Sequence, residues 1–306
     1  MKKIASLLCV FMLFVSCPAF ADNEINLEDY TFEQLITLRQ QIDNRITQIA
    51  TTVDYSAYTL DGLGYVSNGS EVRINFYEGT NPELIIPAEI DGLPVTQIHQ
   101  AAFEKNKTIT SVVIPNTITV IPDECFSGCS KLTSVVLPDT ITTIGWWAFH
   151  GTRVKSINFP EGLTTIDTAI FQSASGPEGV VILPTTLTSD MEYTFSGVDY
   201  LNGAIIQSSI KIGYAAFNGD RFEFIYIKDG CNVTIDSKPF GSGLRTAIIP
   251  ASVTSISDNA FADSNRVTIV CPPGSYAESY AKSHFIMCDT EHYEQYVQEY
   301  DAQYLN

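Results

Sequence analysis

The sequence predicts an α/β repeat solenoid, in which short parallel strands stack coil on coil behind an N-terminal amphipathic helix. Three observations lead to this fold class. Isoleucine stands five residues before most members of a phenylalanine column, and proline stands eleven residues before most of them. The phenylalanines themselves recur every 21 to 24 residues, at Phe103, Phe126, Phe149, Phe171, Phe195, Phe217, Phe240 and Phe261. Columns of different residue types that keep one register over eight units indicate a repeated coil.

The composition argues against two functions, nucleic-acid binding and membrane insertion. The 306 residues are 45% hydrophobic, and 17 Lys and Arg oppose 35 Asp and Glu, for a net charge of -18. A chain of this kind folds, but it lacks the clustered basic residues that nucleic-acid binding requires. No second long apolar run follows the start of the chain. We therefore expect no nucleic-acid partner and no membrane insertion of the mature chain.

Residues 1–21 read as a secretory signal peptide. Two lysines precede an apolar run over Ile4–Val15, which is shorter than the roughly 20 residues that a bilayer requires. Ala19-Phe20-Ala21 places small residues where a signal peptidase accepts them, so cleavage is expected after Ala21. The alternative is lipid attachment through Cys17. Either way we expect a secreted or cell-surface protein.

Residues 22–54 predict an amphipathic helix. Thr31 and Gln34 form a capping box at its start. One apolar stripe follows at steps of three and four residues, made of Leu35, Leu38, Ile42, Ile46 and Ile49. The stripe needs a partner, which is either the open end of the next domain or the same helix of a second copy in a dimer.

A β-hairpin is expected within residues 55–85, because Asn68-Gly69 is the dipeptide favoured in two-residue hairpin turns. The solenoid follows over residues 86–288, with about eight coils. In one unit Val135 and Leu137 point inward from a strand that Pro138 ends, since proline cannot donate to a ladder. A threonine column seven residues before the phenylalanines should form an exposed ladder.

The last segment, residues 289–306, is acidic and rich in tyrosine. Its tyrosines stand at helical steps, at Tyr293, Tyr296, Tyr300 and Tyr304. Two interpretations stay open, a short amphipathic capping helix and a disordered acidic end.

The sequence shows no pattern typical of catalysis. It contains no CxxC pair, phosphate-binding loop, HExxH or GxSxG. Two segments, Ser257-Asp258-Asn259 and Ser279-Tyr-Ala-Lys282, match motifs of penicillin-recognising enzymes but occur in reversed order. We expect no enzyme, no catalytic residue, no metal and no cofactor. Five cysteines lie beyond residue 21, and buried structural roles suit them best: Cys125, Cys129, Cys231, Cys271 and Cys288.

Trp146 and Trp147 are the candidate binding residues. They stand in columns that are polar or small in most other coils, with Tyr214 as the aromatic exception in the first column. At least one indole should therefore be exposed, and exposed aromatic rings anchor protein interfaces and sugar rings. The alternative is that both rings lie flat on neighbouring turns.

The repeat units resemble the BspA-like leucine-rich repeat surface proteins. The similarity is carried by units such as Ile109–Cys129 and covers residues 72 to 288, with Cys129 where that family often has a buried cysteine. Gln207 and Lys228 depart from the pattern by replacing proline, and Gly176-Pro-Glu-Gly179 interrupts the fifth unit. The resemblance implies a non-enzymatic adhesive or binding solenoid whose partner is a host or bacterial surface protein. The alternative is a glycan-binding module that uses the tryptophan pair.

Overall fold

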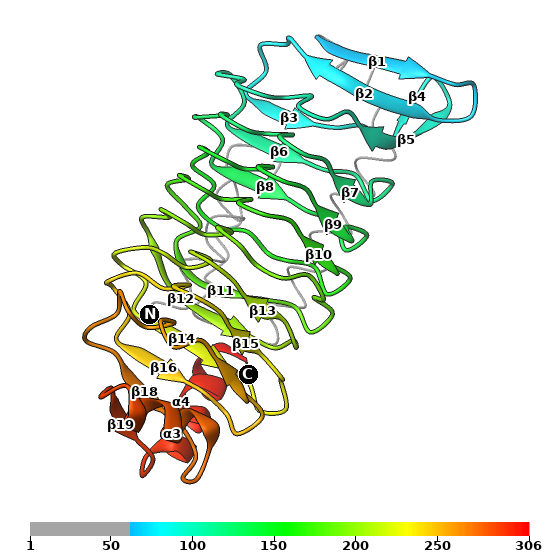
Figure 1. The fold of residues 1–306 in the computed structure, drawn as a ribbon. Helices are drawn as coiled ribbons and strands as arrows, with labels where there is room; N and C mark the ends of the chain where they lie inside the picture. Colours follow the sequence, from blue (N-terminus) through cyan, green and yellow to red (C-terminus); the bar gives the residue numbers. More distant parts are fainter. Residues whose placement is uncertain (1–61, 306) are drawn as a thin grey trace, which may run out of the picture.

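The computed structural model describes residues 62–305. The predicted signal peptide over residues 1–21, Cys17 and the predicted helix over residues 22–54 lie outside the described residues. The described chain winds into one elongated solenoid, with each coil lying beside the next along its length (Figure 1).

The solenoid opens with a β-hairpin. β1 (Leu63–Ser67) pairs antiparallel with β2 (Val72–Tyr77), and the pairing of Ser67 with Val72 leaves a four-residue loop. The expected two-residue turn is therefore wrong. Asn68 closes the longer loop instead, because its Oδ1 accepts the N–H groups of Ser70 and Glu71 at 2.9 and 3.0 Å. β2 then pairs in parallel with β5 (Leu93–Ile98), so it forms part of the first coil, and β4 (Glu89–Ile90) pairs antiparallel with β5.

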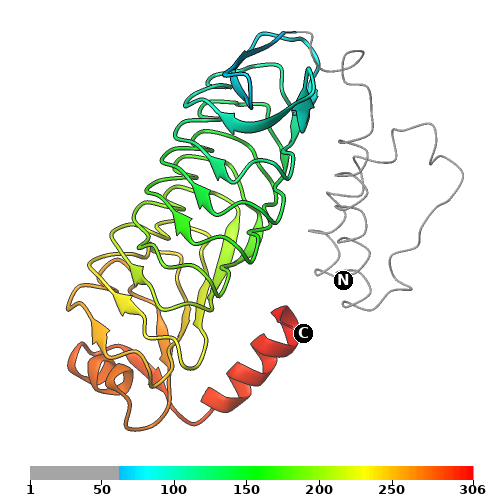
Figure 2. The ribbon, with the colours of Figure 1, turned by 90° about the vertical axis from the view of Figure 1, so that its right-hand side faces the viewer.

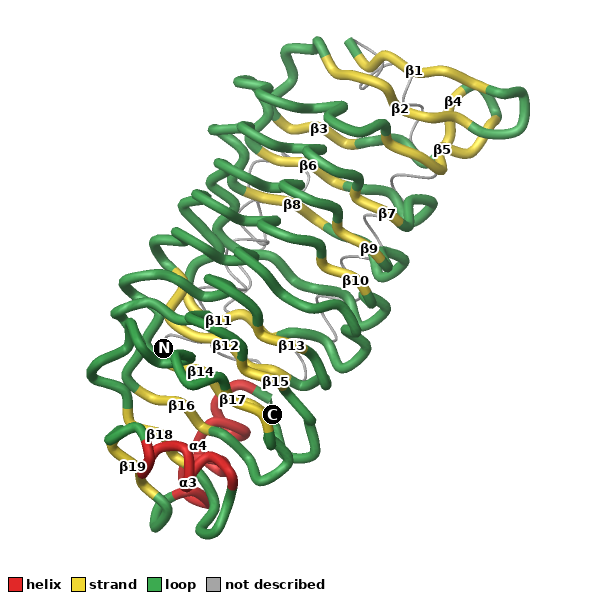
Figure 3. The backbone as a smooth tube through the Cα atoms, in the orientation of Figure 1, coloured by secondary structure: helices red, strands yellow, loops and turns green. Residues whose placement is uncertain are grey.

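Two columns of short strands run along the body (Figure 3). The first holds two parallel sheets, β3 (Glu83–Ile85), β6 (Ser111–Val113) and β8 (Ser134–Val136), then β11 (Gly179–Ile182), β12 (Leu201–Ile206), β14 (Phe224–Ile227), β16 (Thr246–Ile248), β18 (Thr268–Val270) and β19 (Met287–Asp289). The second column, which continues from β5, holds β7 (Val120–Ile121), β9 (Thr143–Ile144) and β10 (Thr165–Ile166), then β13 (Lys211–Ile212), β15 (Thr234–Ile235) and β17 (Ser255–Ile256).

The two departures from the repeat, at Gly176–Gly179 and at Lys228, have different effects on the strand ladder. The first strand column divides into two sheets between β8 and β11, where Gly176-Pro-Glu-Gly179 interrupts the repeat. Where Lys228 replaces proline the coil continues, because the backbone N–H of Lys228 donates to the Ile206 carbonyl at 2.9 Å. A missing proline thus extends the ladder. Beside the glycine segment the ladder is reduced to single contacts, such as the Glu178 N–H that donates to the Lys155 carbonyl at 2.7 Å.

An unbroken column of aromatic rings fills the centre of the body. Consecutive ring centroids lie 5.0 to 6.4 Å apart from Tyr77, through the eight phenylalanines, to Tyr280. The parallel coil-on-coil stack predicted from the sequence is confirmed. The solenoid has about ten coils, however, not eight. Tyrosine takes the place of phenylalanine in the first and last coils, so a search for phenylalanine misses both.

The turn around each phenylalanine has a repeated backbone conformation. The residue two positions before the ring has a positive φ, between 49° and 61°, in seven coils, namely Ala101, Glu124, Trp147, Ala169, Tyr193, Ala215 and Lys238. Backbone hydrogen bonds join successive turns, as when Phe126 N–H donates to the Ala148 carbonyl at 2.9 Å. The left-handed residue is therefore imposed by the coil and not by its own side chain.

The described residues contain two helices, so helix contributes less than the α/β prediction suggested. α3 (Tyr276–Ser283) begins at Ser275, whose side chain accepts the Glu278 N–H, and it closes the last coil. α4 (Tyr293–Tyr304) forms from the acidic tail. It lies along the side of the solenoid (Figure 2) and packs on the outer face of the sheet from β12 to β18. The tail is thus a helix that covers the sheet rather than the end of the stack.

Candidate interaction surface

The turn edge carries the tryptophan pair. The indoles of Trp146 and Trp147 stack with centroids 4.2 Å apart, and His150 stacks on Trp147 at 4.6 Å. Asp123, one coil earlier, holds the turn by accepting the Trp146 backbone N–H at 2.9 Å. Both indoles are half-buried. The three rings therefore form a slab on the surface in which neither indole is fully exposed.

A second aromatic pair lies further along the same edge. The Tyr214 side chain is 45% exposed, and its ring centroid lies 5.3 Å from that of Tyr193. Tyr193 stands in the column of Trp147, two coils on, which corresponds to about 10 Å at the usual strand spacing. Tyr214 stands three coils from Trp146, so the structure does not bring it into contact with the tryptophans. Sequence reasoning missed Tyr193 and His150, although an aromatic residue in the Trp147 column was the available signal for Tyr193.

Two of these aromatic residues occupy strained positions. Trp147 and Tyr193 have φ values of 54° and 53°. A residue other than glycine in this region costs about 1–2 kcal/mol, and a bulky residue is uncommon there. The same conformation recurs in five other coils, at Ala101, Glu124, Ala169, Ala215 and Lys238, so it belongs to the repeat. Trp147 and Tyr193 are therefore distinguished from their equivalents by their aromatic rings and not by their backbone conformation.

The slab gives a pH-dependent signal that can be predicted. Burial lowers the pKa of His150 from its ordinary value of 6.5. A histidine with a lowered folded-state pKa binds a proton more readily when unfolded, so acidification below pH 6.5 works against the folded slab. We expect tryptophan emission to fall on acidification with a midpoint below 6.5, and to stay flat in His150→Gln. A midpoint pH above 6.5 would contradict this expectation. It would mean that the attraction between protonated His150 and the Trp147 ring outweighs the effect of burial on the His150 pKa.

The threonine column forms the ladder that the repeat predicts. The Thr142 hydroxyl donates to the Thr119 carbonyl at 3.2 Å, the Thr164 hydroxyl to the Thr142 carbonyl at 3.2 Å, and the Thr188 hydroxyl to the Thr164 carbonyl at 3.1 Å. All four side chains are exposed. Because the hydroxyls of Thr142, Thr164 and Thr188 already donate to a neighbouring coil, the column contributes more to stacking than to ligand binding.

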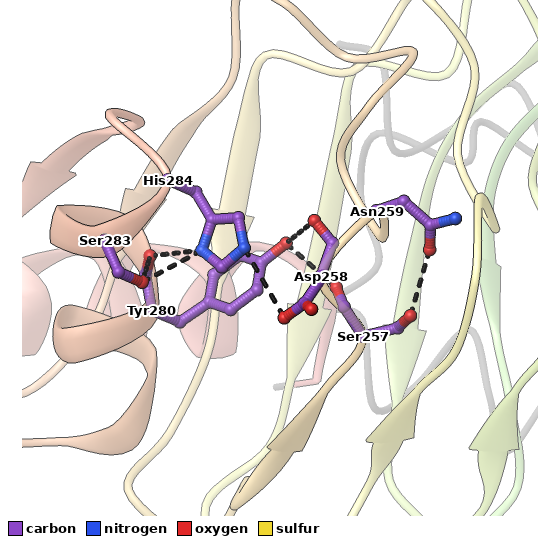
Figure 4. Close-up of polar contacts among 6 residues, drawn as sticks. All are labelled: Ser257, Asp258, Asn259, Tyr280, Ser283 and His284. Carbon is purple, nitrogen blue, oxygen red and sulfur yellow. Dashed lines mark hydrogen bonds and ion pairs between the residues drawn. The ribbon is translucent and has the colours of Figure 1, made fainter.

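The two enzyme-like motifs meet in the fold but serve structure (Figure 4). The Tyr280 hydroxyl donates to the Ser257 carbonyl at 3.0 Å, and the Tyr280 ring stacks on His284 at 4.0 Å. Nε2 of His284 lies 3.6 Å from Asp258.

The remaining polar groups of these motifs have local partners. Ser257 donates to Asn259 at 2.9 Å, and Ser279 donates to the Ser275 carbonyl at 3.3 Å. Lys282 pairs with Glu278. Ser283 Oγ lies 3.0 Å from Nδ1 of His284, but both atoms also lie 2.9 Å from the Tyr280 carbonyl (Figure 4). Nδ1 donates its proton to that carbonyl, so it does not act as a base toward the serine, as nucleophilic catalysis requires. The contacts between the two motifs fasten α3 to the turn of the preceding coil.

The five cysteines of the described chain are free. Four are buried, and Cys288 is half-buried with its sulfur 3.5 Å from that of Cys271. Burial raises the pKa of Cys129 and of Cys271 to about 12, which makes both thiols unreactive. Over residues 62–305, no group of three or more His, Cys, Asp or Glu side chains is arranged to hold a metal ion. No helix in the same range is long and apolar enough to cross a membrane.

A parallel stack of short-strand coils around an aromatic column is a solenoid of the leucine-rich repeat class. The family model for the BspA type leucine rich repeat region matches residues 96–221 and 177–291, with six copies. The chain therefore belongs to the BspA-type leucine-rich repeat family. Proteins of this family are typically surface proteins that interact with other proteins, and they are generally non-enzymatic.

Two solved structures are similar to this chain, and the first of them shows the same fold. The leucine-rich repeat protein of T. pallidum is 19% identical, with a TM-score of 0.50, over 75% of this chain and 96% of that one. A leucine-rich repeat protein from Bacteroides ovatus is 21% identical, with a TM-score of 0.47, over 76% of this chain and 67% of that one. No curated protein matches the sequence.

Proposed function

We propose that the chain is a secreted or cell-surface, non-enzymatic interaction protein that binds a host or bacterial surface protein through its turn edge. The observation that carries the proposal is the presence of two aromatic pairs on the turn edge, Trp146 with Trp147 and Tyr193 with Tyr214, in columns that hold small or polar residues in most other coils. Export would follow from cleavage of residues 1–21 after Ala21, or from lipid attachment at Cys17. Family membership supports the surface location.

The chemistry of the edge suits a protein partner. Aromatic rings supply most of the binding energy where they are desolvated at the centre of an interface. The two aromatic clusters are about 10 Å apart, a distance that one ordinary protein interface covers. The net charge of -18 favours a partner with a basic surface, because complementary charge accelerates association.

The test is a pull-down from host and bacterial surface fractions with the mature chain and its variants. Trp147→Gly and Tyr214→Ala each remove one ring, and the first also relieves the left-handed strain. Lys238→Gly is the matched control, since it makes the same backbone change in the same column without removing an aromatic ring. We expect each aromatic variant to weaken binding about tenfold or more and the control to bind as the parent does. Equal capture by all variants would reject the turn edge.

The stacked tryptophans also suit a sugar ring, which defines the alternative outcome. Soluble polysaccharides and captured proteins are added separately to the protein while its tryptophan emission is measured. Quenching by polysaccharides alone would replace the protein partner with a glycan.

A further inference from the structure

The outer face of the first strand column is covered over only part of its length. α4 buries a row of outward side chains on β12 to β18, namely Ile205, Phe224, Tyr226, Ile248 and Val270. Polar contacts hold the helix in place: Tyr226 donates to Asp301 at 2.9 Å and Tyr293 donates to Asp229 at 2.8 Å. This face therefore accepts an amphipathic helix that lies across the strands.

The same row continues beyond α4 without a cover from the described residues. Strand register places Ile85 beside Val113 and Val113 beside Val136, and it places Ile182 beside the covered Ile205. Three of these side chains are half-buried and Ile182 is 37% exposed. Of the two helices in residues 62–305, neither packs on these positions (Figure 2). We call Ile85, Val113, Val136 and Ile182 the open row. One coil, between Val136 and Ile182, contributes the exposed Asn158 at this position, since Ser156 bridges Ser134.

We infer that residues 31–50 of this chain dock on the open row as an amphipathic helix and continue the cover that α4 begins. The inference is independent of the turn-edge binding surface. The apolar stripe from Leu35 to Ile49 would be about 21 Å long as a helix. The open row spans four coil steps from β3 to β11, or about 19 Å. α4 likewise is slightly longer than the row that it covers. Its 12 residues make a helix of about 18 Å, and the three coil steps from β12 to β18 span about 14 Å.

The position of the first described residue allows this docking within one molecule. The described chain begins at Gly62, directly before β1 in the first coil. Eleven residues, 51–61, separate Gly62 from the proposed helix, and a chain of this length spans at most about 36 Å. A short tether gives the segment an effective local concentration in the millimolar range. Docking on the same molecule is therefore favoured over pairing with a second copy. The side of the sheet is favoured over the end of the stack because α4 already packs on that face.

The test is hydrogen exchange measured by mass spectrometry on the mature full-length chain. We expect slow exchange of the amides in residues 35–49, as in a docked helix. Ile42→Asp, on the stripe, and Val136→Asp, on the open row, should each accelerate that exchange about tenfold or more. The matched controls place the same charge elsewhere: Asn44→Asp lies on the opposite face of the predicted helix, and Thr119→Asp lies on the exposed threonine column. Both controls should leave exchange unchanged.

Each other outcome overturns the inference. Fast exchange of residues 35–49 in the parent protein would mean that the segment does not dock. Slow exchange that Val136→Asp leaves unchanged would place the segment elsewhere, such as on the end of the stack. Protection that disappears on dilution, together with a dimer in sedimentation, would assign the stripe to a second copy. Melting temperatures of the variants establish that each one remains folded.

Discussion

Replacing Phe149 with alanine is expected to lower the free energy of unfolding by about 3–5 kcal/mol, the usual cost of truncating a fully buried phenylalanine. The ring is 0% exposed and stacks between Phe126 at 5.6 Å and Phe171 at 5.3 Å. The surrounding coils cannot collapse into the gap, because backbone hydrogen bonds on both sides set their spacing. Phe149 N–H donates to Ile170 at 2.9 Å, and Phe126 N–H donates to Ala148 at 2.9 Å.

Urea unfolding followed by circular dichroism measures this change. Phe76→Ala is the matched control, since Phe76 is a strand phenylalanine that is 48% exposed and lies outside the central column. Its loss should cost less than about 1 kcal/mol. If both variants lose the same stability, the aromatic column does not carry the energy assigned to it.

The second large effect is expected at Gly176. A Cβ atom added there would lie 1.9 Å from the Val154 carbonyl oxygen of the preceding coil, and backbone cannot move aside as a flexible side chain can. Gly176→Ala should therefore force two coils apart at a cost of about 3 kcal/mol. Gly162→Ala is the control, because its nearest neighbour, the Asp139 carbonyl oxygen, is 3.1 Å from the added atom. Thermal unfolding compares them, and equal melting temperatures for the two variants would contradict the steric argument.

Periodic features of the fold could be predicted from the sequence because they depend on contacts between equivalent residues of neighbouring coils. The phenylalanine spacing predicted the stack, and the threonine column predicted the ladder of Thr119, Thr142 and Thr164. Features without a periodic counterpart were missed or misjudged. The loop at Asn68 depends on side-chain hydrogen bonds within the turn. The docking of α4 depends on contacts between residues as far apart as Tyr226 and Asp301.

The candidate surface could be predicted only in part for the same reason. Column comparison singled out Trp146, Trp147 and Tyr214, since they differ from their equivalents. It could not show that the indoles stack on each other and on His150, which depends on rotamers within one turn. Nor could it show that Trp147 and Tyr193 have a left-handed backbone, because the repeat contains no invariant glycine at that position.

The position of α4 has a mechanical consequence. A solenoid resists tension only through contacts between adjacent coils, so under load it yields one coil at a time. α4 crosses β12, β14, β16 and β18 and is bonded to the sheet through Asp301 and Tyr293. While α4 is in place, those four coils must give way together. Because α4 is the last element of the described chain, a load applied at its end peels the helix away first, and only then can the four coils beneath it yield one at a time.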